Sequence, residues 1–403
     1  MAGIFRLKGK VQNYAWGGTH YIPDLLGITP EDKTYAEYWL GAHVNAPSVV
    51  ESIEGPVNLD AFLNLQLEAS LGTKVQNTFG RLPFLFKVLD VSDMLSIQVH
   101  PTKAEAEKGF KRENDLGIPI TASHRNYKDD NHKPEIMVAL SEFWLLHGFL
   151  SENKIVEVLS TVPEFSGLLP IFNEKGYLGL YKAVMEQTDA ETELMLRPLI
   201  DRILPLYRSG DLRKSDPAYW AAKAMDGAPA SASIDKGIYS IYFFNIVKVK
   251  KGEAIFQDAG IPHAYLEGQN MELMANSDNV LRGGLTPKHV DVPELLKHVK
   301  FEETIPNIIT GEWQQDALEC IYKSPAPDFE LSQIRITEQN VYRSKSHSAQ
   351  ILIVIEGDVD LSDEAGTLLK LGKGQSAFIM ADCDYSIATN ASAVLYKATT
   401  PDL

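Results

Sequence analysis

Four residues in strand-like stretches of the sequence have side chains that commonly bind metal ions. Gln98 and His100 occur in SIQVHP, Glu135 in NHKPE and His263 in GIPHAY. Side chains two positions apart on a strand project from the same face, so Gln98 and His100 are expected to point to one place. Two imidazoles, one carboxylate and one amide oxygen suit zinc or another borderline divalent ion. With a single carboxylate, such an ion would keep a net positive charge and act as an electrophile.

A lone histidine among apolar residues is more often a hydrogen-bonded core residue than a metal ligand. Here the candidates have polar neighbours that a plain core strand would avoid, namely Ser96, Lys133 and Glu267. Buried polar groups cost free energy unless they make an interaction, so this context favours a metal site. Spacing alone decides little, because the candidates are spread over positions 98 to 263.

Apolar patterns divide the chain into strand-rich and helical parts. Short β-like runs, among them LPFLFKVLDV, MLSIQVHP and EIMVALSEFWLLHGF, fill the region up to about residue 150. Between residues 151 and 226, four segments have apolar residues at helical spacing, and Ser151 and Ser215 are predicted N-caps. The small-residue segment APASASIDKG (228–237) is interpreted as a linker, after which residues 238–268 are predicted to return to strands.

These parts predict a mainly β protein with an α-helical insertion. Residues 1–150 and 234–316 are expected to form one metal-binding catalytic domain, because His263 must reach the other ligands. Residues 151–233 would be the inserted helical domain, and residues 317–403 a C-terminal jelly roll that lacks metal ligands.

A weak internal repeat links the two strand-rich parts. When KKGEAIFQDAGIPHAY is written above GKGQSAFIMADCDYSI so that Gly252 faces Gly374, His263 stands opposite Tyr385. The repeat predicts two related β-barrels, of which only the first binds metal.

Composition excludes several classes of partner. The chain has 403 residues, of which 44% are hydrophobic, and a formal net charge of −16, which argues against nucleic acid or an anionic membrane. No apolar run reaches the roughly 20 residues of a membrane span, and the N-terminal residues lack the features of a signal peptide. Cys320 and Cys383 form no CxxC pattern and predict neither a disulfide framework nor a thiolate zinc site. We therefore expect a cytoplasmic protein.

Antiparallel strands joined by glycine turns, with metal ligands that project inward, are typical of the double-sheet jelly roll of cupins. The second cupin motif is present around His263, with Glu267 where asparagine is common. The first motif is altered, because its paired histidines are replaced by Gln98 and His100 and its glutamate is displaced to Glu135. The expected architecture is therefore two cupin-like jelly-roll barrels plus a helical domain.

Longer motifs indicate a narrower family. NYAWGG, AEYWLGAH, LPFLFKVLD, SIQVHP, NHKPE, PHAY and NSDNVLRGGLTPKHVD occur in this order. Over most of residues 10–295 the chain resembles the type I mannose-6-phosphate isomerases, and after about residue 317 the match is to architecture more than to motifs. The resemblance implies one zinc ion per chain, a cupin-like catalytic domain, an inserted helical domain and a second jelly roll.

The resemblance also implies roles for individual residues. The zinc ligands would be Gln98, His100, Glu135 and His263. The catalytic groups would be Arg282, Lys133 and Glu272, and the substrate-binding groups would be Tyr265 in the sugar pocket and Ser96, Lys87 and Lys288 as candidates for the phosphate. Three further residues lie in matching motifs without a role that we can derive: Trp16, Glu37 and His132.

The implied reaction interconverts D-mannose 6-phosphate and D-fructose 6-phosphate by moving a proton between C1 and C2 through an enediolate. The developing oxyanion needs stabilisation, which zinc can give as a Lewis acid. Arg282 can donate a planar fork of hydrogen bonds to the enediolate or to the phosphate. The base stays open at this point, between Lys133, Glu272 and a metal-bound hydroxide.

Two other classes of function fit the same residues. A cupin-type metal-dependent oxygenase would use iron at these ligands, and a non-catalytic sugar-phosphate-binding protein would use the metal for structure alone. We expect the protein to be a monomer whose partner is a small-molecule sugar phosphate, with no obligate protein partner.

Overall fold

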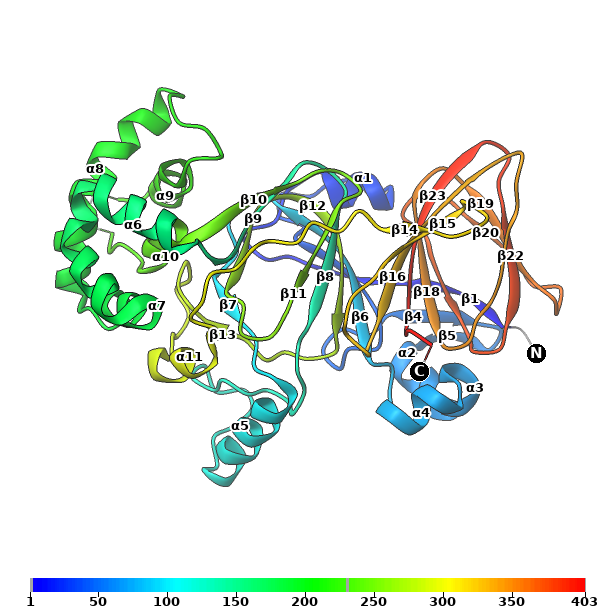
Figure 1. Ribbon diagram of the computed structural model, residues 1–403. Helices are drawn as coiled ribbons and strands as arrows, with labels where there is room; N and C mark the ends of the chain where they lie inside the picture. The colour runs from blue at the N-terminus through cyan, green and yellow to red at the C-terminus, as the bar shows by residue number, and fades with distance from the viewer. Residues whose placement is uncertain (1–2, 230–231, 403) are drawn as a thin grey trace.

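The computed structural model describes residues 3–229 and 232–402 (Figure 1). Ala230 and Ser231, within the predicted linker, lie outside the described residues, as do Met1, Ala2 and Leu403. The helices of residues 152–243 gather at one end of the molecule, the strands that carry the candidate ligands occupy the middle, and the C-terminal strands form the other end, where the short helices of residues 59–79 also lie.

A ten-stranded sheet carries the candidate metal ligands. Its long strand β12 (His263–Ala275) pairs with β6 (Phe84–Val91), β8 (Glu135–Ala139) and β9 (Phe143–Phe149), and its first residue pairs with β7 (Gln98–Val99). The other members are β2 (Lys10–Gln12), β3 (Glu37–Leu40), β10 (Phe244–Val249), β11 (Ala254–Gln257) and β13 (Leu281–Arg282). The strand-rich stretches before and after the helical insertion thus meet in one sheet.

The C-terminal part contains two further sheets. The larger one has nine strands in the order β14 (Glu312–Trp313), β15 (Glu319–Tyr322), β16 (Glu330–Thr337), β23 (Ser392–Thr399), β18 (Gln350–Glu356), β21 (Ser376–Ile379), β1 (Ile4–Lys8), β4 (Val49–Ser52) and β5 (Gly55–Asn58). The smaller one consists of β17 (Tyr342–Lys345), β22 (Asp384–Ala388), β19 (Val359–Asp363) and β20 (Leu368–Leu371). Strands β1, β4 and β5 from the start of the chain therefore share a sheet with strands that follow residue 317.

The predicted block of helices is present. It consists of α6 (Glu152–Thr161), a 3₁₀ helix (Pro163–Leu168), α7 (Leu169–Met185), α8 (Asp189–Arg208) and α9 (Pro217–Met225), and one further helix, α10 (Gly237–Phe243), packs with it. These helices share a hydrophobic core with the sheet, in which Ile97 and Phe149 belong to the same cluster as Tyr181 and Trp220. This shared core fixes the helical block to the side of the sheet where β7 and β9 lie.

Two details of the helical prediction are wrong. The predicted strand after the linker begins as helix α10, whose residues are all buried. A continuously apolar run shows neither the period of a strand nor that of a helix, so the sequence pattern could not separate them. The N-cap of α9 is Asp216 and not Ser215, whereas Ser151 is the N-cap of α6 as predicted.

Helices within the predicted strand-rich regions were not anticipated. They are α1 (Tyr21–Leu26), α2 (Leu59–Leu65), α3 (Leu67–Leu71), α4 (Thr73–Phe79), α5 (Lys103–Asp115) and α11 (Val292–His298). Helix α5 begins where the Thr102 side chain accepts a hydrogen bond from the Glu105 backbone amide. The segment from residue 116 to 134 then leads from α5 to β8 and forms part of the candidate site.

The aligned repeat corresponds to similar local structure in both copies. Gly252 has φ of 86° and Gly374 has φ of 80°, a region that favours glycine because other residues are strained there. Each glycine is followed by a short strand, β11 or β21, and then by the strand that contains the aligned residue, His263 in β12 or Tyr385 in β22.

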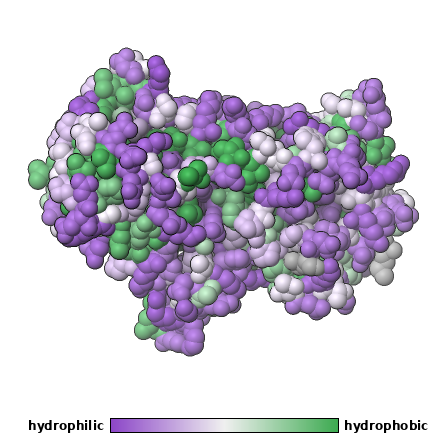
Figure 2. All heavy atoms as spheres, viewed as in Figure 1, coloured by the Kyte–Doolittle hydropathy of each residue, from purple (hydrophilic) through white to green (hydrophobic). Residues whose placement is uncertain are grey.

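Figure 2 shows that hydrophilic residues cover most of one face and that hydrophobic residues form small groups among them. Every helix within the described ranges is either too short or too polar to span a bilayer.

Candidate metal centre

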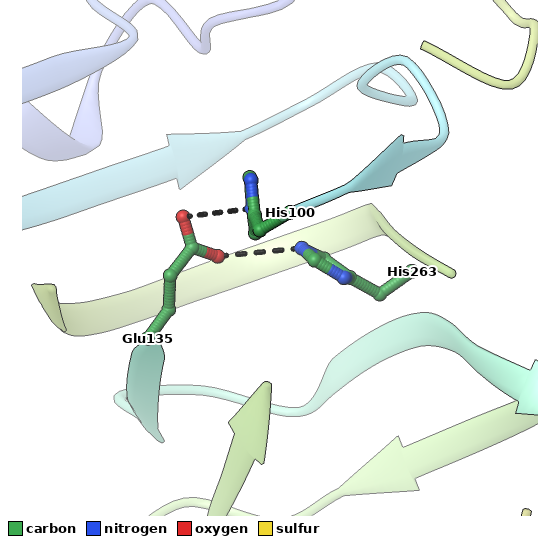
Figure 3. A group of neighbouring side chains, drawn as sticks. All are labelled: His100, Glu135 and His263. Atoms are coloured by element: carbon green, nitrogen blue, oxygen red, sulfur yellow. Dashed lines mark ion pairs between the residues drawn. The ribbon is translucent and has the colours of Figure 1, made fainter. Parts of the chain in front are cut away.

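Three of the four predicted ligands converge on one point (Figure 3). Nε2 of His100 lies 3.5 Å from Oε1 of Glu135, and Nε2 of His263 lies 3.4 Å from Oε2 of the same carboxylate. One ligand atom from each side chain lies within 4.8 Å of the others, and all three residues are buried. Ligand atoms that bind a common zinc ion at about 2.0–2.2 Å lie roughly 3–4 Å apart, so little movement is needed to hold one.

Hydrogen bonds orient both imidazoles. Nδ1 of His100 lies 2.8 Å from the backbone carbonyl of Asn279, and Nδ1 of His263 lies 2.9 Å from that of Ile261. A carbonyl only accepts, so each Nδ1 must donate, and each Nε2 then presents its lone pair to the centre. Both Nε2 atoms are buried without a hydrogen-bond partner. Such atoms are rare unless they have a use, and a divalent metal ion supplies one.

The electrostatics of the centre also suit a cation. Burial lowers the pKa of His100 to about 4, so the imidazole is neutral and able to bind metal at neutral pH. Burial would raise the pKa of Glu135, but the positive charge of Lys133, together with the interactions of the two imidazoles, outweighs it and holds that pKa well below its usual value. Lys133 Nζ lies 3.2 Å from Glu135 Oε1. Glu135 is therefore an ionised carboxylate.

Gln98 lies beside this centre. It is paired across the sheet with His263 on one side and with Arg282 on the other, so these three side chains form a row on one face of the sheet. Gln98, Glu135 and His263 line one small chamber of about 50 Å³. This position allows the amide oxygen to serve as the fourth ligand.

The chamber contains a second buried charge group, in which Lys87 lies between two carboxylates. Its Nζ is 2.9 Å from Glu272 Oε2 and 3.6 Å from Glu37 Oε2, and only 6% of the Lys87 residue is exposed. Burial would lower the pKa of Lys87, but Glu272 and Glu37 outweigh it and raise that pKa. The ammonium of Lys87 is therefore committed to carboxylates and is poorly placed to receive a phosphate.

Glu272 and Tyr265, both predicted for the site, line the same chamber. Burial raises the pKa of Glu272, although the nearby Lys87 opposes this effect. Burial, followed by the charge of Glu272, also raises the pKa of Tyr265 well above its usual value. The Tyr265 hydroxyl is buried without a hydrogen-bond partner, so it can donate to a ligand in the chamber.

A larger cleft of about 990 Å³ adjoins the chamber at Lys133, which lines both. The predicted residues Arg282 and Lys288 line this cleft, and Lys288 is exposed. Ser96 is half-buried and lines neither the chamber nor the cleft. Apart from Ser96, the structure thus brings the predicted site residues together around two connected cavities.

Several residues at the site were not predicted to act there. Glu37 lines the chamber, and Trp39 Nε1 donates a short hydrogen bond to its Oε2. His43 and Asp278, whose Nε2 and Oδ1 are 3.2 Å apart, line the cleft. Asn279 acts partly through its backbone carbonyl, which no side-chain pattern in the sequence could reveal.

Comparisons with known proteins identify relatives along the whole chain. Residues 4–151 match the family model of the phosphomannose isomerase type I catalytic domain. The mannose-6-phosphate isomerase of Escherichia coli is 37% identical over 384 residues, which cover 94% of this chain and 95% of the relative. The human mannose-6-phosphate isomerase is 32% identical over 421 residues, 95% of each chain. A crystal structure of the mannose 6-phosphate isomerase from Salmonella typhimurium, bound to its substrate fructose 6-phosphate and to zinc, covers all of both chains with 35% identity and a TM-score of 0.88.

Proposed function

Because this chain belongs to the type I phosphomannose isomerase family, we propose that it is a zinc-dependent aldose–ketose isomerase that interconverts D-mannose 6-phosphate and D-fructose 6-phosphate. The observation that carries this proposal is the convergence of His100, Glu135 and His263, with two unpartnered Nε2 atoms, in a chamber that adjoins a cleft.

The residues that would hold the ion are Gln98, His100, Glu135 and His263. A zinc ion held by these residues would supply the positive charge of a Lewis acid, which would polarise the sugar carbonyl and stabilise the enediolate. Lys133, 3.2 Å from Glu135, adds a second positive charge on the side of the chamber that opens to the cleft. Charge that is fixed before the reaction stabilises a developing oxyanion without the cost of reorganisation.

We assign proton transfer between C1 and C2 to Glu272. It is the carboxylate that lines the chamber, lies outside the ligand set and has a raised pKa, which burial causes. A raised pKa makes a carboxylate a stronger base for a weak carbon acid. Lys87 holds the Glu272 carboxylate in place at 2.9 Å, and Tyr265 can donate its hydroxyl to a sugar oxygen.

Arg282 is positioned to bind the substrate rather than the metal. Its backbone pairs with Gln98, and its side chain lines the cleft. We assign to its guanidinium the hydrogen bonds that hold the substrate in register with the metal. Lys288, which is exposed and lines the cleft, attracts the anionic substrate over a longer range. Ser96 lines neither cavity, so we assign it no contact with the phosphate.

We also propose the finer architecture that the repeat predicts. The two strand-rich parts would be cupin-like jelly-roll barrels, with residues 1–150 and 234–316 as the metal-binding domain, residues 151–233 as the inserted helical domain, and residues 317–403 as the jelly roll without ligands. The matching glycine turns at Gly252 and Gly374 support this division, with β1, β4 and β5 contributed to the second barrel.

We propose that the protein acts in the cytoplasm as a monomer, with a sugar phosphate as its partner. Cys320 and Cys383 are free, as is usual in a reducing compartment. Gel filtration with light scattering tests the monomer.

The experiment that tests the proposed function is a coupled isomerase assay on zinc-replete protein, run in parallel in D₂O. We expect turnover of both sugar phosphates and deuterium at C2 of mannose 6-phosphate. Absence of turnover at full zinc occupancy would reject the isomerase. Substrate-dependent oxygen uptake would instead support the oxygenase, and tight binding without deuterium incorporation would support the non-catalytic binding protein.

A further inference from the structure

The cleft beside the metal chamber is lined by more cationic side chains than carboxylates. Its lining includes five cationic side chains, namely Arg81, Lys128, Lys133, Arg282 and Lys288. Lys133 pairs with Glu135, whereas the other four form no ion pair with any carboxylate in residues 3–229 and 232–402. Unpaired cations in a concave site indicate a site for an anion.

The acidic residues of the cleft are mostly engaged with other groups. Oδ1 of Asp129 accepts hydrogen bonds from the Ser277 hydroxyl and the Asn131 backbone amide, and its Oδ2 accepts one from the backbone of Asp278. The Asp278 side chain faces His43 at 3.2 Å. Asp60 is the remaining carboxylate of the lining. These three carboxylates keep their negative charge, but five cationic side chains line the same cleft, so positive charge is in excess there.

Lys128 is held in place by neutral partners alone. Its Nζ donates to the backbone carbonyls of Ile120 at 2.8 Å and Ala122 at 3.0 Å, which occupy two of its three N–H groups. Its backbone amide donates to Oδ1 of Asn279 at 2.7 Å. Carbonyl partners orient the ammonium without neutralising it, so one N–H and the full charge remain for a ligand.

Arg282 supplies the second unpaired charge. Its guanidinium makes no hydrogen bond or ion pair within the described part of the chain, although the residue is half-buried. Burial, followed by the charges of Arg125 and Arg282, lowers the pKa of Lys128. Arg282 and Lys128 are thus close enough to repel each other, and an anion between them would remove that cost.

We propose that Lys128, together with Arg282, forms the subsite that binds the phosphate group of the sugar phosphate, and that Lys128 determines selectivity for phosphorylated sugars. This inference rests on the proposed function and names the part of the cleft that recognises the anion. The reacting carbons C1 and C2 must lie at the metal, and the phosphate on C6 is several bonds away. The phosphate therefore belongs in the cleft rather than in the chamber.

The predicted alternative, Lys87, fits a phosphate poorly. A phosphate that approached Lys87 would meet the carboxylates of Glu272 and Glu37, which already contact its ammonium. The chamber of about 50 Å³ must also hold the reacting end of the sugar, whereas the cleft of about 990 Å³ has room for the rest of the molecule.

The test compares Lys128→Met with Lys154→Met, which removes the same charge from an exposed position on α6. Loss of a charged hydrogen bond predicts a fall of about 10- to 100-fold in kcat/KM for fructose 6-phosphate in Lys128→Met, carried mainly by KM. Inhibition by inorganic phosphate should weaken by a similar factor. The zinc content should not change, and any isomerisation of unphosphorylated mannose should fall much less than that of fructose 6-phosphate. Lys128→Arg should restore most of the phosphate inhibition, and Lys154→Met should behave like the wild type.

An unchanged inhibition constant for phosphate in Lys128→Met would overturn the proposal, and so would an equal loss of activity on mannose and on the sugar phosphate. A second measurement needs no variant. Inorganic phosphate should protect Lys128, and not Lys154, from acetylation in the wild-type protein, as measured by mass spectrometry. Equal acetylation of Lys128 with and without saturating phosphate would also contradict the subsite. This readout is independent of turnover, so it separates failure of the subsite from failure of the isomerase.

Discussion

His100 and Asn279 are far apart in the sequence but are joined by a hydrogen bond of 2.8 Å from the imidazole to the backbone carbonyl. The side chain of Asn279 also holds the segment that leads to β8. Its Oδ1 accepts from the Lys128 backbone amide at 2.7 Å, and its Nδ2 donates to the backbone carbonyl of Asn131 at 2.8 Å. One residue therefore connects a metal ligand to the loop that carries the cations of the cleft.

This connection predicts that Asn279→Ala weakens both metal binding and substrate binding. The backbone carbonyl remains, but the lost side-chain bonds free the loop and leave buried amide groups unsatisfied, at about 1–3 kcal/mol of folding stability. We expect zinc affinity to fall by roughly 10- to 100-fold, measured by competition with a chelator. Asn340→Ala, which removes a turn asparagine in the C-terminal part, is the control. Wild-type zinc affinity in Asn279→Ala would contradict this role.

The four ligands should contribute unequally to metal affinity. Gln98→Ala should lower zinc occupancy less than His100→Ala, because a neutral amide oxygen is the weakest donor of the set. Elemental analysis of the two variants, purified in parallel at the same zinc concentration, measures this difference. If Gln98→Ala lost zinc as completely as His100→Ala, the assignment of the amide as a weak fourth ligand would be wrong.

His147 predicts a specific dependence of stability on pH. Its Nδ1 lies 2.8 Å from Oε1 of Gln257, and burial lowers its pKa from 6.5 to about 4. Between pH 6.5 and 4 the unfolded chain binds a proton at His147 that the folded protein does not bind. The contribution of neutral His147, about 3 kcal/mol in full, is therefore present above pH 6.5 and is lost as the pH falls towards 4.

Urea unfolding of chelator-treated protein from pH 4 to pH 7 measures this dependence. His147→Gln lacks the titrating group, so its stability should fall less than that of the wild type over this range. Parallel curves for the two proteins would show that His147 does not contribute.

Lys397 and Glu319 form a buried ion pair of 2.6 Å in the C-terminal part, far from the ligands in sequence. The Ser332 and Tyr342 hydroxyls also donate to this carboxylate. Lys397→Met should destabilise the protein by about 3–5 kcal/mol, because it leaves the carboxylate buried without its cation. Adding Glu319→Gln should recover part of that loss. Denaturant unfolding measures both changes, and a loss below about 1 kcal/mol in Lys397→Met would contradict the prediction.

The sequence predicted those parts of the site that depend on side-chain type. Histidine, glutamine and glutamate in apolar strands indicated a metal site, and the structure brings Glu135 between His100 and His263 as that prediction requires. Lys128 could not be predicted, because a lysine in a loop is usually a solvated surface residue. Its position becomes informative only when the Ile120 and Ala122 carbonyls and the neighbouring Arg282 are known.

For the fold, too, the sequence predicted some elements and not others. Segments with a clear period, such as residues 191–208, became helices as predicted. Helix α10 was missed because its run of buried apolar residues carries no period. The pairing of β1 with β21 joins the two ends of the chain, and such long-range pairing leaves no local signal in the sequence.

The most direct test of the central claim is to follow zinc content and fructose 6-phosphate isomerisation in the same samples as zinc is removed by a chelator and then restored. The account predicts one zinc ion per chain, and isomerisation that falls and returns in proportion to it in the wild type and is absent from His263→Ala. Full isomerisation by zinc-free protein, or stoichiometric zinc in His263→Ala, would contradict it.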